Sequence, residues 1–179
     1  MQVLSRQRGV SLIEVLVAML IFSIGVLGIA LMQIKGAQYT KQAGARTVAV
    51  LQARSLSDAM RANPAGVYGV KSKDLIPSKN GDLSESYYLH SGPAVPTSVG
   101  CDNDACRQAH SDLAQWITQL KAAAPTPVKA DGSMDSSALA GVAVDSDKGS
   151  LIITSSWNGM SASASGVAQN DSYHFTYHP

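Results

Sequence analysis

The sequence predicts an α+β protein in which one long N-terminal helix packs on a small antiparallel sheet, with one additional short helix. Three observations support this prediction. Twenty uncharged residues run from Val15 to Ile34, and no proline occurs before Pro64, so one helix can continue through this stretch. Three segments in the C-terminal third have the length and residue types of strands. The 179 residues suffice for one small domain and an anchor.

The apolar run is long enough to cross a membrane. At a rise of 1.5 Å per residue, a helix of about twenty residues spans about 30 Å, the thickness of a bilayer's hydrocarbon core. A secretory signal peptide has a shorter apolar region, so we expect a membrane-spanning helix. Arg6 and Arg8 precede the run, whereas Lys35, Lys41 and Arg46 follow it, so charge alone leaves the orientation open.

We expect the helix to run from Val10 to about Asn63, with residues 10–35 in the membrane and residues 36–63 amphipathic. Ser11 is suited to cap its start, and Pro64 ends it. In the first half, small residues allow close approach of a neighbouring helix: Ser23, Gly25 and Gly28. In the second half, we expect an apolar stripe to pack on the sheet: Val48, Leu51, Leu56, Ala59 and Met60.

Glu14 is an acidic residue at the N-terminal end of the apolar run. A carboxylate at the bilayer centre costs about 2.5–3.5 kcal/mol, and less near the interface. One interpretation makes Glu14 an interfacial residue at the helix N-terminus, where the macrodipole favours negative charge. The other interpretation gives it a positive partner in apolar surroundings. The residues around it favour the second interpretation.

The segment Gly9-Val-Ser-Leu-Ile-Glu14, directly followed by the apolar run, resembles the type IV prepilin motif. The resemblance implies that a prepilin peptidase cleaves between Gly9 and Val10 and methylates the new amine of Val10. Residues 1–9 are then a leader, and Glu14 is the fifth mature residue. Val10 is a departure, because the family most often has Phe there. The implied partner of Glu14 is the amine of Val10, from its own chain or from an adjacent subunit, which makes Glu14 an assembly contact.

Further stretches are similar to the PilV-type minor pilins. These are the segment Ile24-Gly-Val-Leu-Gly-Ile-Ala-Leu-Met-Gln33, the segment Met60-Arg-Ala-Asn63, and a Cys-Asp…Ala-Cys segment that leads into a helix with a Trp. The resemblance implies a type IV pilin-like fold and a low-abundance subunit that primes or joins a bacterial type IV pilus, with roles such as twitching motility or adhesion. The implied partners are the prepilin peptidase, other minor pilins and the major pilin. The protein is then expected in the inner membrane with residues 64–179 in the periplasm, and later in the pilus at the cell surface.

Three alternatives stay open. A type II secretion pseudopilin shares the leader and the helix, and the neighbouring genes distinguish it from a minor pilin. An adhesin or DNA-uptake pilin uses the domain to bind a ligand. A membrane-anchored periplasmic enzyme should keep its activity after removal of residues 1–63. We expect no enzyme and no nucleic-acid partner, because the net charge is only +1 and no catalytic motif is present.

The domain beyond residue 63 begins with a turn at Asn63–Gly66, and Ser86–His90 is expected to be a short strand. A second helix is expected after the cysteine pair, capped by Asp102 or Asp104 and stopped by Pro125 and Pro127. Its apolar stripe has a period of 3.6 residues: Ala105, Ala109, Leu113, Trp116, Ile117 and Leu120.

Three strands are expected near the C-terminus: Leu139–Val144, Gly149–Trp157 and Ser172–His178. In the last, aromatic residues alternate with polar ones, so one face is expected on the long helix and the other in water. The run Leu151–Ile153 favours a strand covered on both sides. Ser161–Gly166 is expected to be a connector.

Cys101 and Cys106 are expected to form a disulfide that fastens the start of the second helix to the preceding loop. Closing this small loop contributes about 2 kcal/mol to the folding stability. Structural zinc usually needs four Cys or His ligands, so zinc is the weaker interpretation. The four histidines are expected on the surface, and no Cys–His pair at a meaningful local spacing stands out. The segment from Asp145 to Gly149 faintly resembles the start of a calcium loop but lacks its bidentate Glu, so we expect a turn. No metal and no cofactor are expected.

Overall fold

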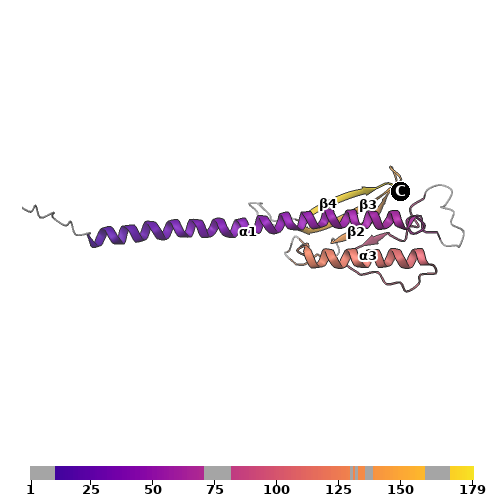
Figure 1. Cartoon of the computed structure of the whole chain (residues 1–179), viewed down its shortest axis with the longest axis horizontal. Helices are drawn as coiled ribbons and strands as arrows, with labels where there is room; N and C mark the ends of the chain where they lie inside the picture. The colour runs from indigo at the N-terminus through magenta and orange to yellow at the C-terminus, as the bar shows by residue number, and fades with distance from the viewer. Residues whose placement is uncertain (1–10, 71–81, 130, 132, 136–138, 160–169) are drawn as a thin grey trace, which may run out of the picture. The chain divides into compact units, whose positions relative to one another are not determined.

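The computed structural model describes residues 11–70, 82–129, 131, 133–135, 139–159 and 170–179. Its elements are labelled in Figure 1: α1 (Leu12–Ala62), α2 (Pro64–Val67), β1 (His90–Ser91), α3 (Asp104–Ala123), β2 (Ala140–Asp145), β3 (Ser150–Asn158) and β4 (Asn170–Tyr177). The chain divides into two units, Met1–Thr40 and Lys41–Pro179, which are described separately. The long helix, the four-stranded antiparallel sheet and the additional helix confirm the predicted α+β class.

Within the first unit, α1 begins at Leu12, and the carbonyl of Ser11 accepts hydrogen bonds from the backbone N–H groups of Glu14 and Val15. The hydroxyl of Ser23 donates to the carbonyl of Met19 at 2.7 Å, so its polar group is satisfied inside the helix. The large apolar side chains of residues 12–34 are 44–83% exposed. This part of the helix therefore presents a continuous apolar surface.

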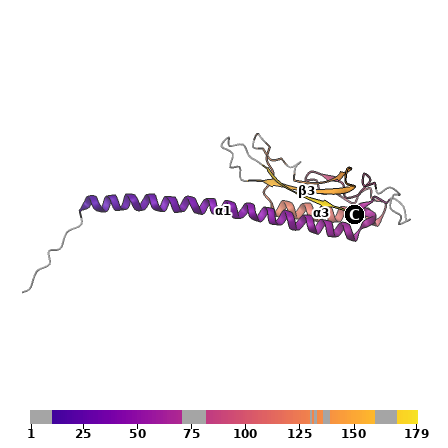
Figure 2. The ribbon, with the colours of Figure 1, turned by 90° about the horizontal axis from the view of Figure 1, so that it is seen from above.

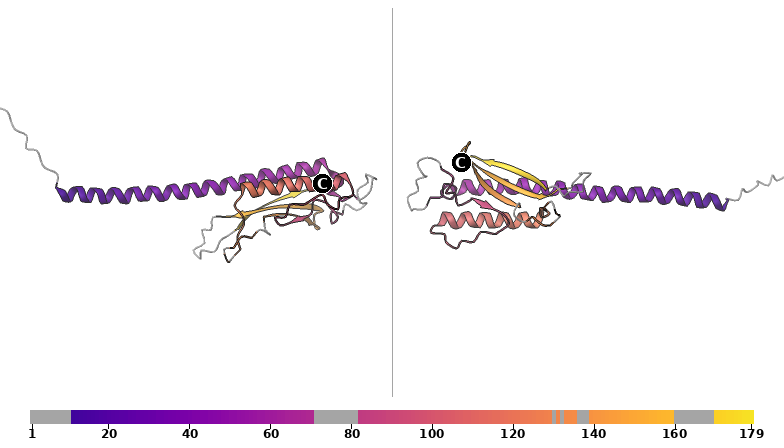
Figure 3. Two further views of the ribbon diagram at one scale, coloured as in Figure 1. Left: turned by 90° about the horizontal axis from the view of Figure 1, so that it is seen from below. Right: turned by 180° about the vertical axis from the view of Figure 1, so that it is seen from behind.

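The second unit consists of two layers. The sheet has the order β1-β2-β3-β4, and each neighbouring pair is antiparallel. The C-terminal half of α1 and the helix α3 lie side by side on one face of this sheet, as Figure 2 and the left view of Figure 3 show. The core between the layers is formed by residues from both, including Met60 of α1, Leu113 and Ile117 of α3, and Leu151 and Ile153 of β3. The sheet and α3 thus cover one side of the part of α1 that belongs to this unit, from Ala45 to Met60.

The buried stripe of α1 differs from the predicted one. Leu51 is 57% exposed, and Val48 and Ala59 are only half-buried, so these three assignments are wrong or incomplete. Leu56 and Met60 are buried as predicted, and the stripe continues toward the N-terminus through small residues: Ala45, Ala49 and Ala53. The alanines follow a spacing of four and have no side chain beyond Cβ, so they permit the sheet and its aromatic residues to come close to the helix.

The segment after α2 is mostly turn rather than the predicted strand. Only His90 of Ser86–His90 is in β1, which continues to Ser91. Tyr87 donates its backbone N–H to the carbonyl of Gly66, and Leu89 donates to Ser86, so these groups are used locally and not in a ladder. Tyr88 is fully buried. The segment therefore places the buried Tyr88 in contact with Asn63, just before α2, and with Asp112 of α3.

The helix α3 has the predicted apolar face but a different cap. Asn103, rather than Asp102 or Asp104, is the N-cap, and its Oδ1 accepts from the backbone N–H of Cys106 at 2.8 Å. The buried positions match the predicted stripe except that Cys106 is buried and Ala105 is half-buried. The helix ends at Ala123, just before Pro125, as expected.

The three C-terminal strands confirm the prediction to within two residues at each end. In β4, Tyr177 is buried and Tyr173 and Phe175 pack against the core, whereas the alternate residues are exposed. In β3, Leu151 and Ile153 are buried but Ile152 is only half-buried. The prediction that both faces of this strand are covered is wrong, because the helices lie on a single face. The connector predicted at 161–166 lies outside the described residues.

Candidate functional site

Glu14 lies in the first turn of α1 and has no positively charged side chain along the apolar part of the helix. Residues 11–34 contain no Lys, Arg or His. The N-terminal end of the helix carries a partial positive charge, which stabilises a nearby carboxylate only partly. A full positive partner for Glu14 must therefore come from the segment before the helix or from another chain.

The carboxylate borders a shallow, open depression on the helix surface. The depression is lined by Glu14, Val15, Ala18, Met19 and Phe22. Ala18 follows Glu14 by four residues, one turn along the same face, and its methyl group leaves space between larger apolar side chains. The arrangement places a negative charge at the edge of an apolar hollow.

Gly9 and Val10, the predicted cleavage and methylation positions, lie outside the described residues. Cleavage, methylation and the assembly contact stay predictions. Among the described residues, α1 is the one helix that is long and apolar enough to cross a membrane.

The comparison with protein families returns one match. Residues 4–30 match the family described as the prokaryotic N-terminal methylation motif, a range that includes Gly9, Val10 and Glu14. No curated protein and no solved structure is significantly similar to this chain. The match supports a type IV pilin-like prepilin, that is, a precursor of the pilin or pseudopilin type. This signature indicates a structural protein.

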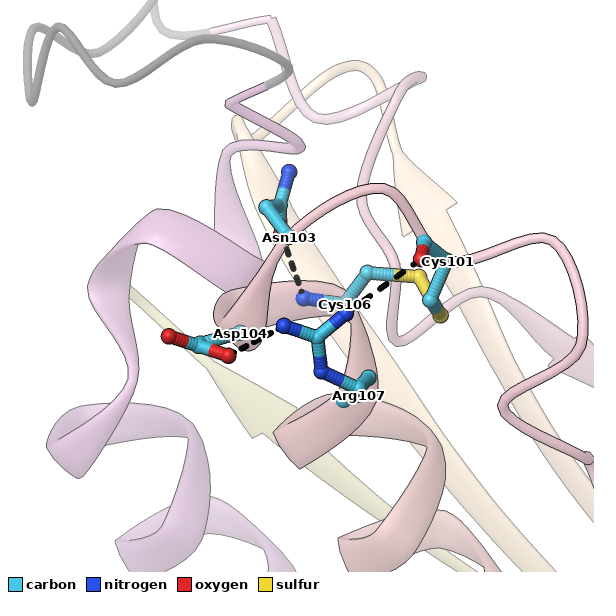
Figure 4. A network of polar contacts seen from close by, with 5 residues as sticks. All are labelled: Cys101, Asn103, Asp104, Cys106 and Arg107. Carbon is cyan, nitrogen blue, oxygen red and sulfur yellow. Dashed lines mark hydrogen bonds and ion pairs between the residues drawn. A yellow bond between two sulfur atoms is a disulfide. The ribbon is translucent and has the colours of Figure 1, made fainter.

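A second notable region is the disulfide-closed start of α3, drawn in Figure 4. The structure contains the predicted disulfide between Cys101 and Cys106, whose Cα atoms are 5.5 Å apart. Arg107 forms an ion pair with Asp104 and donates to the carbonyl of Cys101 at 3.4 Å. Asn103, which lies between the two cysteines in the sequence, is the N-cap of the helix. The disulfide therefore fastens the preceding loop to the first turn of the helix.

Asn103 also connects this start to distant parts of the domain. Its Nδ2 donates to the carbonyl of Val70 at 3.0 Å and to the hydroxyl of Tyr87 at 3.2 Å. These contacts explain why an Asn serves as the cap. Its carbonyl oxygen caps the helix while its amide nitrogen donates to other segments, which neither neighbouring Asp could do.

His110 is a residue that the sequence analysis missed. Its Nδ1 donates to the carbonyl of Thr97 at 2.7 Å and lies 3.4 Å from Sγ of Cys101. The statement that no Cys–His pair stands at a meaningful local spacing is therefore wrong. The signal was present in the sequence, because His110 follows Cys106 by four residues, one turn along a helix.

A buried polar network joins the end of α1 to α3. The hydroxyl of Tyr88 donates to Oδ2 of Asp112 at 2.6 Å, and Asn63 donates from Nδ2 to that hydroxyl and to the carbonyl of Ala105. Gln108 donates to the other oxygen of Asp112 at 2.7 Å. Burial, followed by the contact with Asp112, raises the pKa of Tyr88. The phenol thus remains a neutral donor that holds the two helices together.

Two further candidate ligands, His174 and Asp145, have polar partners within the domain. His174 is exposed on the sheet, between the hydroxyls of Thr154 and Ser172 at 3.1 Å each. The segment between β2 and β3 is a turn, as predicted, in which Lys148 pairs with Asp145 at 3.4 Å. Asp145 therefore already has a cationic partner inside its own turn.

Proposed function

We propose that this protein is a minor pilin of a bacterial type IV pilus, which is cleaved after Gly9, methylated on Val10 and then joins a priming complex or the fibre. The observation that carries the proposal is the methylation motif at residues 4–30. The apolar surface of α1 supports it, because large side chains from Leu12 to Ile34 are exposed in the isolated chain. Such a surface needs either lipid or the helices of other subunits.

The proposed organisation follows from this role. Residues 1–9 are the leader, residues 10–35 lie in the membrane and later in the filament core, and residues 36–63 support the globular domain at 64–179. The domain is exported to the periplasm and then reaches the cell surface. A disulfide in the domain fits an oxidising compartment. The proposed partners are the prepilin peptidase, the major pilin and other minor pilins, among which the PilV-type group is the one that the sequence resembles.

Glu14 is the proposed assembly contact. Its carboxylate stands beside an apolar hollow that includes Ala18, and no cationic side chain lies within residues 11–34. The amine of Val10 in an adjacent subunit supplies the missing positive charge. In lipid or a filament core, this attraction is screened far less than in water. The pair forms only when two helices have the correct axial register, so it aligns an incoming subunit.

Processing is tested first, by the intact mass of the protein from cells with an active prepilin peptidase. We expect the mass of a chain that begins at Val10 and carries one added methyl group. A mass that corresponds to the chain from Met1 contradicts the proposal at its first step.

Assembly is tested with Glu14→Gln, which removes the charge but keeps the size of the side chain, and with Glu14→Ala. We expect normal cleavage at Gly9 and a loss of the protein from sheared pili and from pull-downs with other pilins, at equal membrane levels. Ser23→Ala is the matched control, because the Ser23 hydroxyl is satisfied within its own helix. Equal recovery of the Glu14 variants and the control removes Glu14 from the mechanism.

The hollow is tested with Ala18→Leu, which fills the space beside Glu14 while retaining the charge. We expect reduced recovery in sheared pili, whereas Ala30→Leu on the same exposed apolar helix should be recovered normally. A type II secretion pseudopilin carries the same motif. Its signature in these experiments is normal processing, no recovery in pili, and loss of protein secretion when the gene is deleted.

A further inference from the structure

We propose that Cys101, Cys106 and His110 form a site for a zinc-like divalent cation in the dithiol form of this protein, and that the disulfide seen here is the oxidised, metal-free form of the same site. The three residues offer two sulfurs and one ring nitrogen that all lie within 4.8 Å of one another. A thiolate–imidazole set of this kind suits zinc.

The distances favour a tetrahedral centre. Bonds of about 2.3 Å to sulfur and about 2.0–2.1 Å to nitrogen, at tetrahedral angles, place sulfur and nitrogen about 3.5 Å apart. Nδ1 of His110 already lies 3.4 Å from Sγ of Cys101. The two sulfurs must separate to about 3.8 Å when both bind a metal. With the Cα atoms 5.5 Å apart, rotation of the two side chains is sufficient for this separation.

The backbone holds the ligands in place by contacts that do not depend on the disulfide. Cys106 and His110 are one turn apart on α3, and Asn103 caps that helix through the N–H of Cys106. Arg107 donates to the carbonyl of Cys101 and so holds the loop near the helix. His110 is half-exposed, which leaves room for a water molecule as the fourth ligand.

One existing contact must change. Nδ1 of His110 donates to the carbonyl of Thr97 at 2.7 Å, so in this form it carries a proton. Metal binding requires the other tautomer, with the proton on Nε2. Thr97 is exposed, so water can replace the donor to its carbonyl. The rearrangement is therefore confined to one ring and one surface loop.

The two forms exclude each other because the metal binds thiolates. The chain is synthesised with free thiols, so no reductant is needed to create the site. On oxidation by a disulfide donor, the thiolate sulfurs of Cys101 and Cys106 together give up two electrons and form their bond, and the metal is released. The donor's disulfide bond takes up the two electrons and breaks, and its two sulfurs take up two protons from water to become a dithiol. Either form fastens the loop to α3, so the metal can hold the domain in its final conformation before oxidation.

The test uses the full chain in detergent micelles, reduced with a phosphine under anaerobic conditions and then freed of reductant. Alkylation of both thiols in a sample verifies the dithiol form. Titration with Co²⁺ should give one equivalent of a complex with tetrahedral cobalt–thiolate absorption, which Zn²⁺ displaces. The oxidised protein should give none. Equal Co²⁺ binding by the reduced wild type and by the Cys101→Ser/Cys106→Ser variant overturns the proposal.

His110→Ala tests the third ligand, with His174→Ala as the control, because His174 is an exposed histidine on the sheet. The first variant should bind Co²⁺ at least about tenfold more weakly, and the second should bind as the wild type does. Unchanged affinity of His110→Ala overturns the three-ligand site. If reduction unfolds the domain, Zn²⁺ should restore the native tryptophan fluorescence, and a failure to do so also overturns the proposal.

Discussion

The two halves of α1 use apolar residues in opposite ways. Between Leu12 and Ile34 the large apolar side chains are exposed, with values of 44–83%. Between Ala45 and Met60 the buried positions include three alanines at a spacing of four. The half with more apolar area is thus the half that the chain itself does not cover. The exposed large apolar side chains of the first half suit contact with lipid or with other chains. The buried alanines of the second half suit close packing in the core of the chain's own domain.

This difference separates two physical demands on one helix. A surface that faces lipid needs apolar area all round, and the order of its large residues matters little there. A helix face under a sheet needs the right shape on one side, and a large residue there prevents close packing. Leu51 illustrates the point, because it is large and apolar within the second half yet 57% exposed.

The largest expected effect on stability is that of truncating a core leucine to alanine. Leu113→Ala should lower the free energy of unfolding by about 2–5 kcal/mol, because Leu113 is 1% exposed and its removal leaves a cavity. Leu20→Ala, at a position 63% exposed, should leave the unfolding midpoint of the domain unchanged. Denaturant titration of the full chain in detergent, followed by tryptophan fluorescence, measures both, because Trp116 and Trp157 lie in the second unit. Equal midpoints for the two variants contradict the comparison.

An intermediate effect is expected from overpacking the alanine stripe. Ala53 is fully buried, so Ala53→Leu should cost about 1–3 kcal/mol of folding stability through displaced side chains and backbone. Ala43→Leu makes the same change at an exposed position of the same helix and should have almost no effect. The same denaturant titration applies. If both variants are as stable as the wild type, close packing does not require alanine at the buried positions of the helix.

The smallest effect concerns Tyr88 and pH. Its raised pKa means that the unfolded chain loses the phenol proton first, as the pH passes the ordinary value of 10.0. The stability gained from the neutral phenol is therefore complete below about pH 10 and is lost as the pH rises further. Tyr88→Phe should lower stability by about 1 kcal/mol at neutral pH, because the bond to Asp112 is lost.

The pH dependence distinguishes this role from simple packing. The difference in stability between the wild type and Tyr88→Phe should stay constant up to about pH 10 and should shrink as the pH rises from about 10 to about 12. Tyr177→Phe is the control for alkaline effects in general, because burial also raises the pKa of Tyr177 but no carboxylate hydrogen bond contributes. A constant difference between wild type and Tyr88→Phe across this range contradicts a role for the neutral phenol.

The sequence by itself determined the features that depend on neighbours along the chain. The apolar run, the helix that ends before Pro64, the alternation of β4 and the apolar face of α3 each follow from patterns within a few residues. The methylation motif is likewise a local pattern, and the family match over residues 4–30 confirms it. The Cys101–Cys106 disulfide joins residues only five apart, so its prediction needed no tertiary information.

The tertiary structure decided what depends on contacts between distant segments. Asn103 became the cap because Val70 and Tyr87 accept its amide, and no local rule favours it over the adjacent aspartates. The loop that carries Thr97 places the disulfide beside His110. The sheet lies on one side of the helices, so alanines rather than Leu51 form the buried stripe. Each outcome depends on which surfaces meet, and periodicity within one segment carries no information about its partner.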